Sequence, residues 1–379
     1  MKHTILTGLL VFSSIASAQT YKIIDLGQLI PVGINVEGEV AGNLNGDAAI
    51  WTSHGGAREL GRLSGGTFSH AAGINDLGAV AGTADGPGIV SDASESVSCD
   101  DLTQPFLWTP GRGFATAPSI PLVFPFGPSC DQADYANGVN LLDQVVGSNM
   151  DFATYKYGFL WGKSGVSLFT GFFQTNANAI NDFGLVAGQI SAVSLLNDWS
   201  HASFWKNGAV TDLGTLPANA SNWSACSGAT SMNDLDQIVG WSGTVVSGSF
   251  PCDELRNMTV PVHAFIWQAG TGLKDLGTLP GDTSSVAQKV NLLGVVVGSS
   301  GNTVIADPQN QYSILVTGHP FMWSKATGMR NLNSLISPSS GWTLNTAVDI
   351  NVWGQVVGSG TLHGETHGYL LTPSVLLRY

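Results

Sequence analysis

The sequence predicts an all-β fold, a seven-bladed β-propeller with four antiparallel strands per blade, on the strength of two phrases that recur along the chain. The first phrase is an apolar residue and an asparagine, then a tight turn, then a short strand that ends in glycine. It occurs seven times, at residues 34–42, 74–82, 139–147, 180–188, 232–240, 290–298 and 350–358. A repeat this regular is typical of ring and solenoid architectures.

The second phrase is a strand with an aromatic centre that follows each copy of the first. Its copies are DAAIW (47–51), QPFLW (104–108), YGFLW (157–161), HASFW (201–205), HAFIW (263–267), HPFMW (319–323) and HGYLL (367–371). The segments between turns are four to six residues long, and none keeps a helical apolar period, so we expect almost no helix. Radial packing of four-stranded sheets would cover their apolar faces and leave only short edges.

A third strand closes the ring. An Asp-Leu-Gly strand follows the aromatic strand at residues 212–214 and 275–277, with looser copies at 59–61 and 331–333. The last unit lacks this strand, whereas the segment YKIIDLGQL (21–29) carries it at the other end of the chain. We therefore expect the N-terminal strand to complete the last blade.

Residues 1–20 read as a signal peptide, with a basic start, a short apolar run and a cleavage site near Ala18. Residues 21–379 are expected to form one secreted, extracellular and monomeric propeller domain. No later stretch is apolar enough for a membrane span. The 14 Lys and Arg residues are scattered and the formal net charge is −13, which argues against nucleic-acid binding.

The units resemble the HAF-type repeats of bacterial exported proteins, named for the His-Ala-Phe at the start of the aromatic strand. HAFIW followed by GLKDLGTLPGD is a close copy, and the units around HASFW and HPFMW are looser. The resemblance covers nearly all of residues 21–373 and implies export and a repeat fold. It implies no activity, and it supplies no catalytic residue.

Most of the recurring polar and aromatic residues are predicted to be structural. The asparagines precede a turn, which their side chains can cap. The tryptophans lie at one register of one strand and are expected in the core; they are Trp51, Trp108, Trp161, Trp205, Trp267 and Trp323. The recurring histidines are expected at strand ends; they are His201, His263, His319 and His367.

Function is expected on one face, where long insertions concentrate at 83–103, 115–132, 189–200, 242–262 and 299–318. A binding patch there would use Phe124, Tyr155, Trp199 and Trp223. An acid–base site there would use His70, Asp100, Asp131 and Tyr135. No cofactor is expected; the alternatives are a calcium site built from Asp100, Asp101 and Asp131 and a metal site built from His363, Glu365 and His367.

The four cysteines predict two disulfides, because an even number in an exported chain forms pairs. Sequence alone allows three pairings. The positions of the insertions favour Cys99–Cys130 and Cys226–Cys252.

Two functions remain open. The first is a non-catalytic binding or scaffold protein that presents loops to an extracellular polysaccharide or a cell-surface protein. The second is an exported polysaccharide lyase or hydrolase with its site at the channel mouth. The fold alone does not choose between them, so the sequence leaves open whether the protein is an enzyme.

Overall fold

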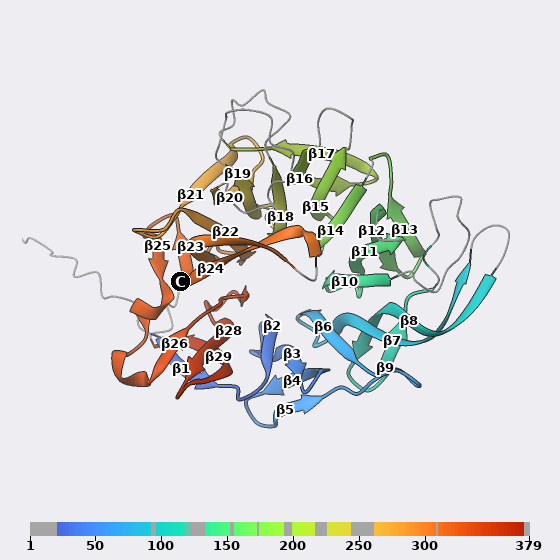
Figure 1. Cartoon of the computed structure of the whole chain (residues 1–379), viewed down its shortest axis with the longest axis horizontal. Coiled ribbons are helices and arrows are strands. Elements are labelled where there is room, and N and C mark those ends of the chain that lie inside the picture. The colour runs from blue at the N-terminus through green and yellow to red at the C-terminus, as the bar shows by residue number, and fades with distance from the viewer. Residues whose placement is uncertain are drawn as a thin grey trace, which may run out of the picture.

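The computed structural model describes residues 21–91, 96–118, 120, 133–151, 155–172, 174–192, 199–216, 226–243, 261–307 and 310–374. This part of the chain is all-β apart from two short 3₁₀ helices, η2 (Leu332–Leu335) and η3 (Pro338–Ser340). Several four-stranded antiparallel sheets are arranged around a common centre, which is consistent with a propeller (Figure 1). None of the helices described here has the length and hydropathy needed to cross a bilayer.

Each repeat of the sequence forms one set of consecutive antiparallel strands, which we call a unit. The strands of units 1 to 3 are β2 (Ile30–Ile34), β3 (Val40–Leu44), β4 (Asp47–Thr52) and β5 (Gly56–Glu59); β6 (Ser69–Ile74), β7 (Val80–Ser91), β8 (Ser96–Thr109) and β9 (Gly113–Thr116); and β10 (Ala133–Val139), β11 (Val145–Asp151), β12 (Tyr155–Gly162) and β13 (Gly165–Phe169). A single parallel bridge, Ala133 to Thr103, joins units 2 and 3 into one hydrogen-bonded sheet.

Units 4 to 6 repeat the same order. Their strands are β14 (Gln174–Ile180), β15 (Val186–Ala192), β16 (Trp199–Lys206) and β17 (Ala209–Gly214); β18 (Ser227–Met232), β19 (Ile238–Gly243), β20 (Val262–Gln268) and β21 (Gly272–Gly277); and β22 (Ser284–Val290), β23 (Val296–Asp307), β24 (Asn310–Ser324) and β25 (Gly328–Asn331). In each unit the first strand, which ends at the recurring asparagine, lies nearest the centre (Figure 1).

Unit 7 draws on both ends of the described chain. It contains β26 (Trp342–Leu344), β27 (Asp349–Ile350), β28 (Val356–Leu362) and β29 (Glu365–Pro373), together with β1 (Tyr21–Asp25). Strand β1 pairs antiparallel with β29, with Tyr21 opposite Pro373 and Asp25 opposite Tyr369. The YKIID segment therefore lies beside the aromatic strand of the last repeat.

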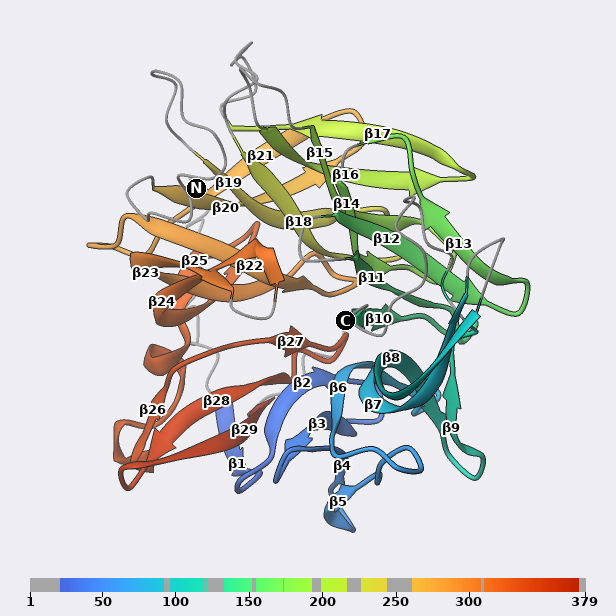
Figure 2. The same cartoon turned by 45° about the vertical axis from the view of Figure 1, so that its right-hand side comes forward.

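Hydrophobic clusters join residues of neighbouring sheets, and these sheets follow one another around the centre (Figure 2). One cluster joins Ala41 of unit 1 to Phe106 and Trp108 of unit 2. Another joins Leu29 of unit 1 to Leu370 of unit 7, so the first and last units also share a core. All six repeat tryptophans are members of such clusters or pack against them, which confirms their structural role.

Two of the predicted insertions are not loops. Residues 83–103 and 299–318 mostly continue the strands of their units, as long hairpins of β7 with β8 and of β23 with β24. The sequence reading missed this because it took the repeat length of the shorter units as the natural strand length.

Candidate functional site

The recurring asparagine organises a tight turn at the inner edge of every unit. In unit 2 the Oδ1 of Asn75 accepts hydrogen bonds from the backbone N–H groups of Leu77 (3.0 Å) and Ala79 (2.9 Å). The same two contacts occur in all seven units. This confirms the predicted capping role of the asparagines.

The same side chains also link each unit to the next, which the sequence did not reveal. The Nδ2 of each asparagine donates to the backbone carbonyl of the asparagine in the next unit. The distances are 3.4 Å for Asn35 to Asn75, 2.8 Å for Asn75 to Asn140, 3.0 Å for Asn140 to Asn181, 3.5 Å for Asn181 to Asn233, 2.8 Å for Asn233 to Asn291, 3.0 Å for Asn291 to Asn351 and 3.0 Å for Asn351 back to Asn35. Because all seven asparagines are buried, each lost contact would leave a polar group unpaired.

The turn needs one residue in the left-handed backbone region, three positions after the asparagine. Five units place glycine there, with φ between 74° and 79°. The other two place Asp143 (φ 58°) and Asp236 (φ 56°), a residue type that tolerates this region. The residue just before it, two positions after the asparagine, is left at the tip of the turn.

Six of these tips carry a large, exposed hydrophobic side chain. We call this set the apolar crown; its members are Leu77, Leu142, Phe183, Leu235, Leu293 and Trp353, and their exposed fractions run from 55% to 80%. Unit 1 has the exposed Glu37 at the equivalent position. Trp353 is fixed across the boundary between units 7 and 1, because its indole N–H donates to the carbonyl of Val36 (2.9 Å). We call the surface made by the seven turns the turn face.

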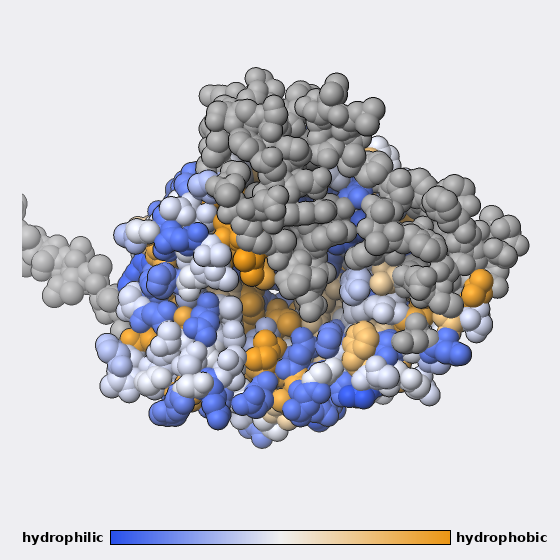
Figure 3. All heavy atoms as spheres, viewed as in Figure 1, coloured by the Kyte–Doolittle hydropathy of each residue, from blue (hydrophilic) through white to orange (hydrophobic). Residues whose placement is uncertain are grey.

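The residue that directly follows the asparagine lines the centre of the turn face. Three units place an aspartate there, and we call Asp76, Asp182 and Asp234 the mouth aspartates. Each accepts a hydrogen bond from a backbone N–H of the preceding unit, at 2.9 Å, 2.8 Å and 2.9 Å respectively. Together with the asparagines they border a central hollow of about 260 Å³. In the space-filling view, hydrophobic and hydrophilic residues both lie near the middle of the described surface (Figure 3).

The mouth aspartates influence one another electrostatically. Burial raises the pKa of Asp182, and the negative charges of Asp234 and Asp76 raise it further, against the opposing hydrogen bond from the N–H of Leu141. In the described part of the chain, no Lys, Arg or His forms an ion pair with any of the three. The hollow contains one described cation, Lys289, whose Nζ lies 3.9 Å from the Oδ1 of Asp349.

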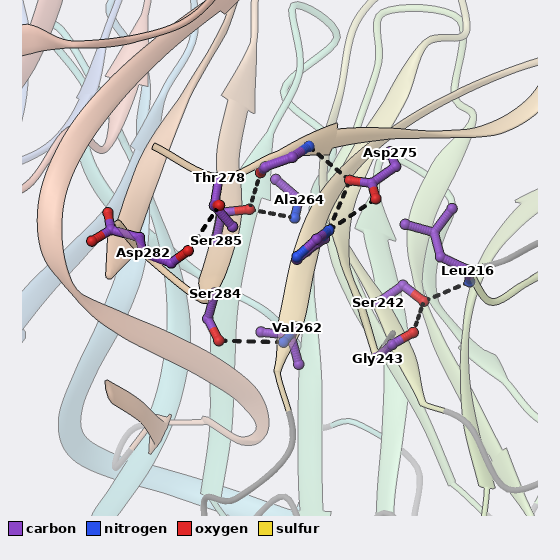
Figure 4. A network of polar contacts seen from close by, with 12 residues as sticks. Leu216, Ser242, Gly243, Val262, Ala264, Asp275, Thr278, Asp282, Ser284 and Ser285 are labelled. Carbon is purple, nitrogen blue, oxygen red and sulfur yellow. Dashed lines mark hydrogen bonds and ion pairs between the residues drawn. The ribbon is translucent and has the colours of Figure 1, made fainter. Parts of the chain in front are cut away.

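The recurring histidines pair with the aspartate of the neighbouring outer strand. His201 Nδ1 lies 2.9 Å from Asp212, and His263 Nδ1 lies 2.9 Å from Asp275 (Figure 4). Burial raises the pKa of Asp212, but the hydrogen bond and charge of His201 and the N–H of Gly214 outweigh it, so the net pKa is lowered. The histidines therefore join two strands, in agreement with their predicted structural role.

The histidine–aspartate pair of unit 7 joins two residues from opposite ends of the described chain. His367 Nδ1 lies 2.9 Å from the Oδ1 of Asp25, which belongs to β1. This hydrogen bond is the main cause of the raised pKa of His367. In unit 6 the outer strand has Asn331 instead of aspartate, and His319 lies 3.6 Å from Asp282.

A second contact that the sequence reading missed is a hydroxyl bridge between units. Ser285 Oγ accepts from the N–H of Ala264 (2.8 Å) and donates to the carbonyl of Gly277 (2.6 Å), so unit 6 holds two strands of unit 5 (Figure 4). Ser69, Thr175 and Ser227 make the same pair of contacts to the units before them. A Ser or Thr near the start of the inner strand was the available signal.

Three of the predicted catalytic candidates lie in the described part of the chain. His70 lies in β6, exposed, with its ring 5.0 Å from that of Phe68. Asp100 is exposed in β8, and Tyr135 is half-buried in β10. Among the residues described, no hydrogen bond joins these three to one another.

Other predicted site residues cannot be placed. Phe124, Asp131 and Trp223 lie outside the described residues, as do Cys130 and Cys252. Tyr155 begins β12, Trp199 begins β16 and Asp101 lies in β8, but their side chains are likewise outside the described part of the structure.

Cys99 and Cys226 are each disulfide-bonded and buried, while the predicted pairing with Cys130 and Cys252 stays a prediction. Within the described ranges, no group of three or more His, Cys, Asp or Glu residues is arranged to hold a metal ion.

No family model and no curated protein matches the chain. Among solved structures it is similar to TolB from Acinetobacter baumannii (12% identity, TM-score 0.37), covering 72% of this chain and 60% of TolB. It is similar to the β-propeller domain of the Trilobed protease from Pyrococcus furiosus (10%, 0.35), covering 83% and 98%. The third is the acylaminoacyl peptidase of Pyrococcus horikoshii (11%, 0.40), covering 90% and 50%. Likenesses this low identify no activity, and the account of the fold rests on the strand pairing itself.

Proposed function

We propose that the protein is an exported, non-catalytic binding scaffold, a seven-bladed β-propeller that docks a secreted or cell-surface protein on its turn face. In this proposal β1 is the outer strand of the last blade. The partner is a protein rather than a polysaccharide, because the crown consists mainly of leucines and sugars favour aromatic platforms. The loop-rich face that the sequence favours remains a second surface, and it lies largely outside the described residues.

Three observations support the closed ring of seven blades. The asparagine side chains form seven hydrogen bonds from unit to unit, and the last of them returns to the first unit. The first and last units share a hydrophobic cluster. His367 and Asp25 repeat, across the two ends of the chain, the histidine–aspartate pair that units 4 and 5 make within one sheet.

The apolar crown is the observation that carries the binding role. Isolated exposed leucines are ordinary on protein surfaces, whereas a contiguous apolar patch marks an interaction site. Here six large apolar side chains occupy one equivalent position on adjoining turns. The fold does not need them there, because the asparagine and the left-handed residue are sufficient to form the turn. Unit 1 makes the same turn with Glu37 at its tip.

The proposal is tested by binding measurements on the full chain. Purified secreted and surface proteins of the source organism, and a panel of extracellular polysaccharides, are screened for binding and for released sugar products. We expect a protein partner whose affinity falls about tenfold or more, as expected for loss of a central apolar contact, in Leu142→Ser/Phe183→Ser.

The matched control is Ile30→Ser, which removes an exposed apolar side chain outside the crown and should leave affinity unchanged. A partner that binds the crown variant as tightly as the native protein would contradict the proposal. Product release from a polysaccharide, abolished by His70→Ala, would replace it with the enzyme hypothesis.

A further inference from the structure

The apolar crown encloses a centre of opposite character, and this combination restricts what can bind. In units 2, 4 and 5 a mouth aspartate directly precedes the crown residue in the sequence. The three mouth aspartates line the central hollow. None of the three forms a described ion pair, and Lys289, which also lines the hollow, lies 3.9 Å from Asp349. An occupant of this surface must therefore bury apolar groups and face negative charge together.

The charge excludes several classes of occupant. A nucleic acid or another anionic polymer would be repelled by the three carboxylates and by the formal charge of −13. A second copy of this chain, docked turn face to turn face, would place two sets of mouth aspartates against each other. Like charges brought together in this way oppose association.

A bare metal ion also fits poorly. A metal ion needs several ligand atoms within about 2.6 Å of one point. The mouth aspartates belong to three different units, with Leu141 of unit 3 between Asp76 and Asp182. Each carboxylate is already fixed by a backbone N–H. A cationic side chain has the length to enter the hollow and the donors to satisfy carboxylates that do not converge.

We propose that the turn face docks a polypeptide segment that places one arginine or lysine between the mouth aspartates and its aliphatic or aromatic neighbours against the apolar crown. This inference rests on the proposed function, since it names the chemistry of the partner at the same surface. The cation would offset the mutual repulsion of Asp182 and Asp234, and the crown would exclude water around it. Leucine or aromatic side chains beside the cation would pack against the leucine, phenylalanine and tryptophan side chains of the crown.

The test is a selection of random dodecapeptides against the immobilised full chain, followed by affinity measurements on the enriched sequences. We expect enriched peptides to contain one Arg or Lys flanked by apolar residues. Replacing that residue with uncharged citrulline or norleucine should weaken binding about twofold to fivefold, as expected for a partly exposed ion pair. The protein variant Asp182→Asn/Asp234→Asn should remove this preference, while Glu59→Gln, an exposed acid of β5, should leave it intact.

The outcomes separate the two proposals. Peptides that need Phe183 but not a cation, or that bind the Asp182→Asn/Asp234→Asn variant equally well, would overturn this inference and leave the proposed function standing. A selection whose peptides bind regardless of Leu142→Ser/Phe183→Ser would contradict both. Sedimentation showing a dimer that Phe183→Ser dissociates would make a second copy the occupant and overturn the inference.

Discussion

At the residue scale, each repeated asparagine performs two structural tasks, one within its own unit and one between units. Its Oδ1 caps the turn of its own unit, and its Nδ2 joins the next unit. The first task could be predicted from the Asn-x-x-Gly pattern, because such turns commonly bind an Asx side chain. The second could not, because it depends on how two sheets far apart in sequence approach each other.

Replacing one ring asparagine should therefore destabilise the whole protein. In Asn233→Ala the N–H groups of Leu235 and Gln237 and the carbonyl of Asn291 lose their partner. We expect a loss of about 1–3 kcal/mol in the free energy of unfolding, measured by urea denaturation. The control is Leu235→Ala at the tip of the same turn, which should change stability by less than about 0.5 kcal/mol. Equal stabilities for the two variants would show that the ring contributes nothing.

The pair between His367 and Asp25 predicts a pH dependence with a definite sign. The folded state raises the pKa of His367 above its ordinary value of 6.5, chiefly through the hydrogen bond to Asp25. The folded state thus holds the proton more tightly than the unfolded chain, and the resulting stabilisation is complete below pH 6.5. It is lost as the pH rises through the folded-state pKa.

Urea denaturation of the native protein and of His367→Gln, from pH 5.5 to pH 8.5, measures this contribution. We expect the native protein to be the more stable at pH 5.5, with the difference narrowing as the pH rises. Comparison with the variant separates His367 from the other histidines. A difference that is constant, or that widens with pH, would contradict the assignment.

At the element scale, the third residue of the second strand of each unit is a glycine that packs against a backbone carbonyl of the segment before it. A Cβ on Gly298 would lie 2.0 Å from the carbonyl oxygen of Val286 and 2.9 Å from the ring of Phe321. Gly147 stands in the same relation to Tyr135 and Phe159. Packing therefore requires a glycine at this position of the repeat, because three strands approach one another closely there.

Gly298→Ala should accordingly cost about 1–3 kcal/mol, the usual range for overpacking a tight core. The matched control is Gly162→Ala, where the new methyl group would lie 3.4 Å from the flexible side chain of Gln144. Differential scanning calorimetry should show a clearly lower Tm for Gly298→Ala alone. Similar Tm values for both variants would contradict this prediction, because they would show that the strands around Gly298 can move apart to accommodate a methyl group.

The four-strand units and the order of their strands could be predicted from periodicity, because each unit repeats the same phrases, whereas the long hairpins of β7 with β8 and of β23 with β24 could not. The candidate site could not. Sequence reading looked to the long insertions for function and passed over the short turns, whose apolar tips seemed part of a structural repeat. Leu77 and Phe183 lie where a strand pattern would assign core residues, and only the turn geometry leaves them exposed.

At the scale of the whole molecule, the turn face exists only if the units form a continuous ring. The crown and the mouth aspartates come from sequence positions between 76 and 353. They share one surface because each asparagine turn contacts the next, including the contact from Asn351 to Asn35. Strand β1 pairs with β29, and the proposed closure of the ring depends on this pairing.

A cross-strand disulfide tests this closure most directly. Lys22 lies opposite Thr372 in the register of β1 and β29, and directly opposed residues in antiparallel strands have Cβ atoms about 4.5–5.5 Å apart. Under mild oxidation, Lys22→Cys/Thr372→Cys should form a new disulfide, detected by peptide mapping, without loss of folded structure. Lys22→Cys/Thr361→Cys, which places the second cysteine on β28, should not. If the first variant stays reduced, or links as readily as the second, the ends do not share a sheet and the ring that carries the crown is wrong.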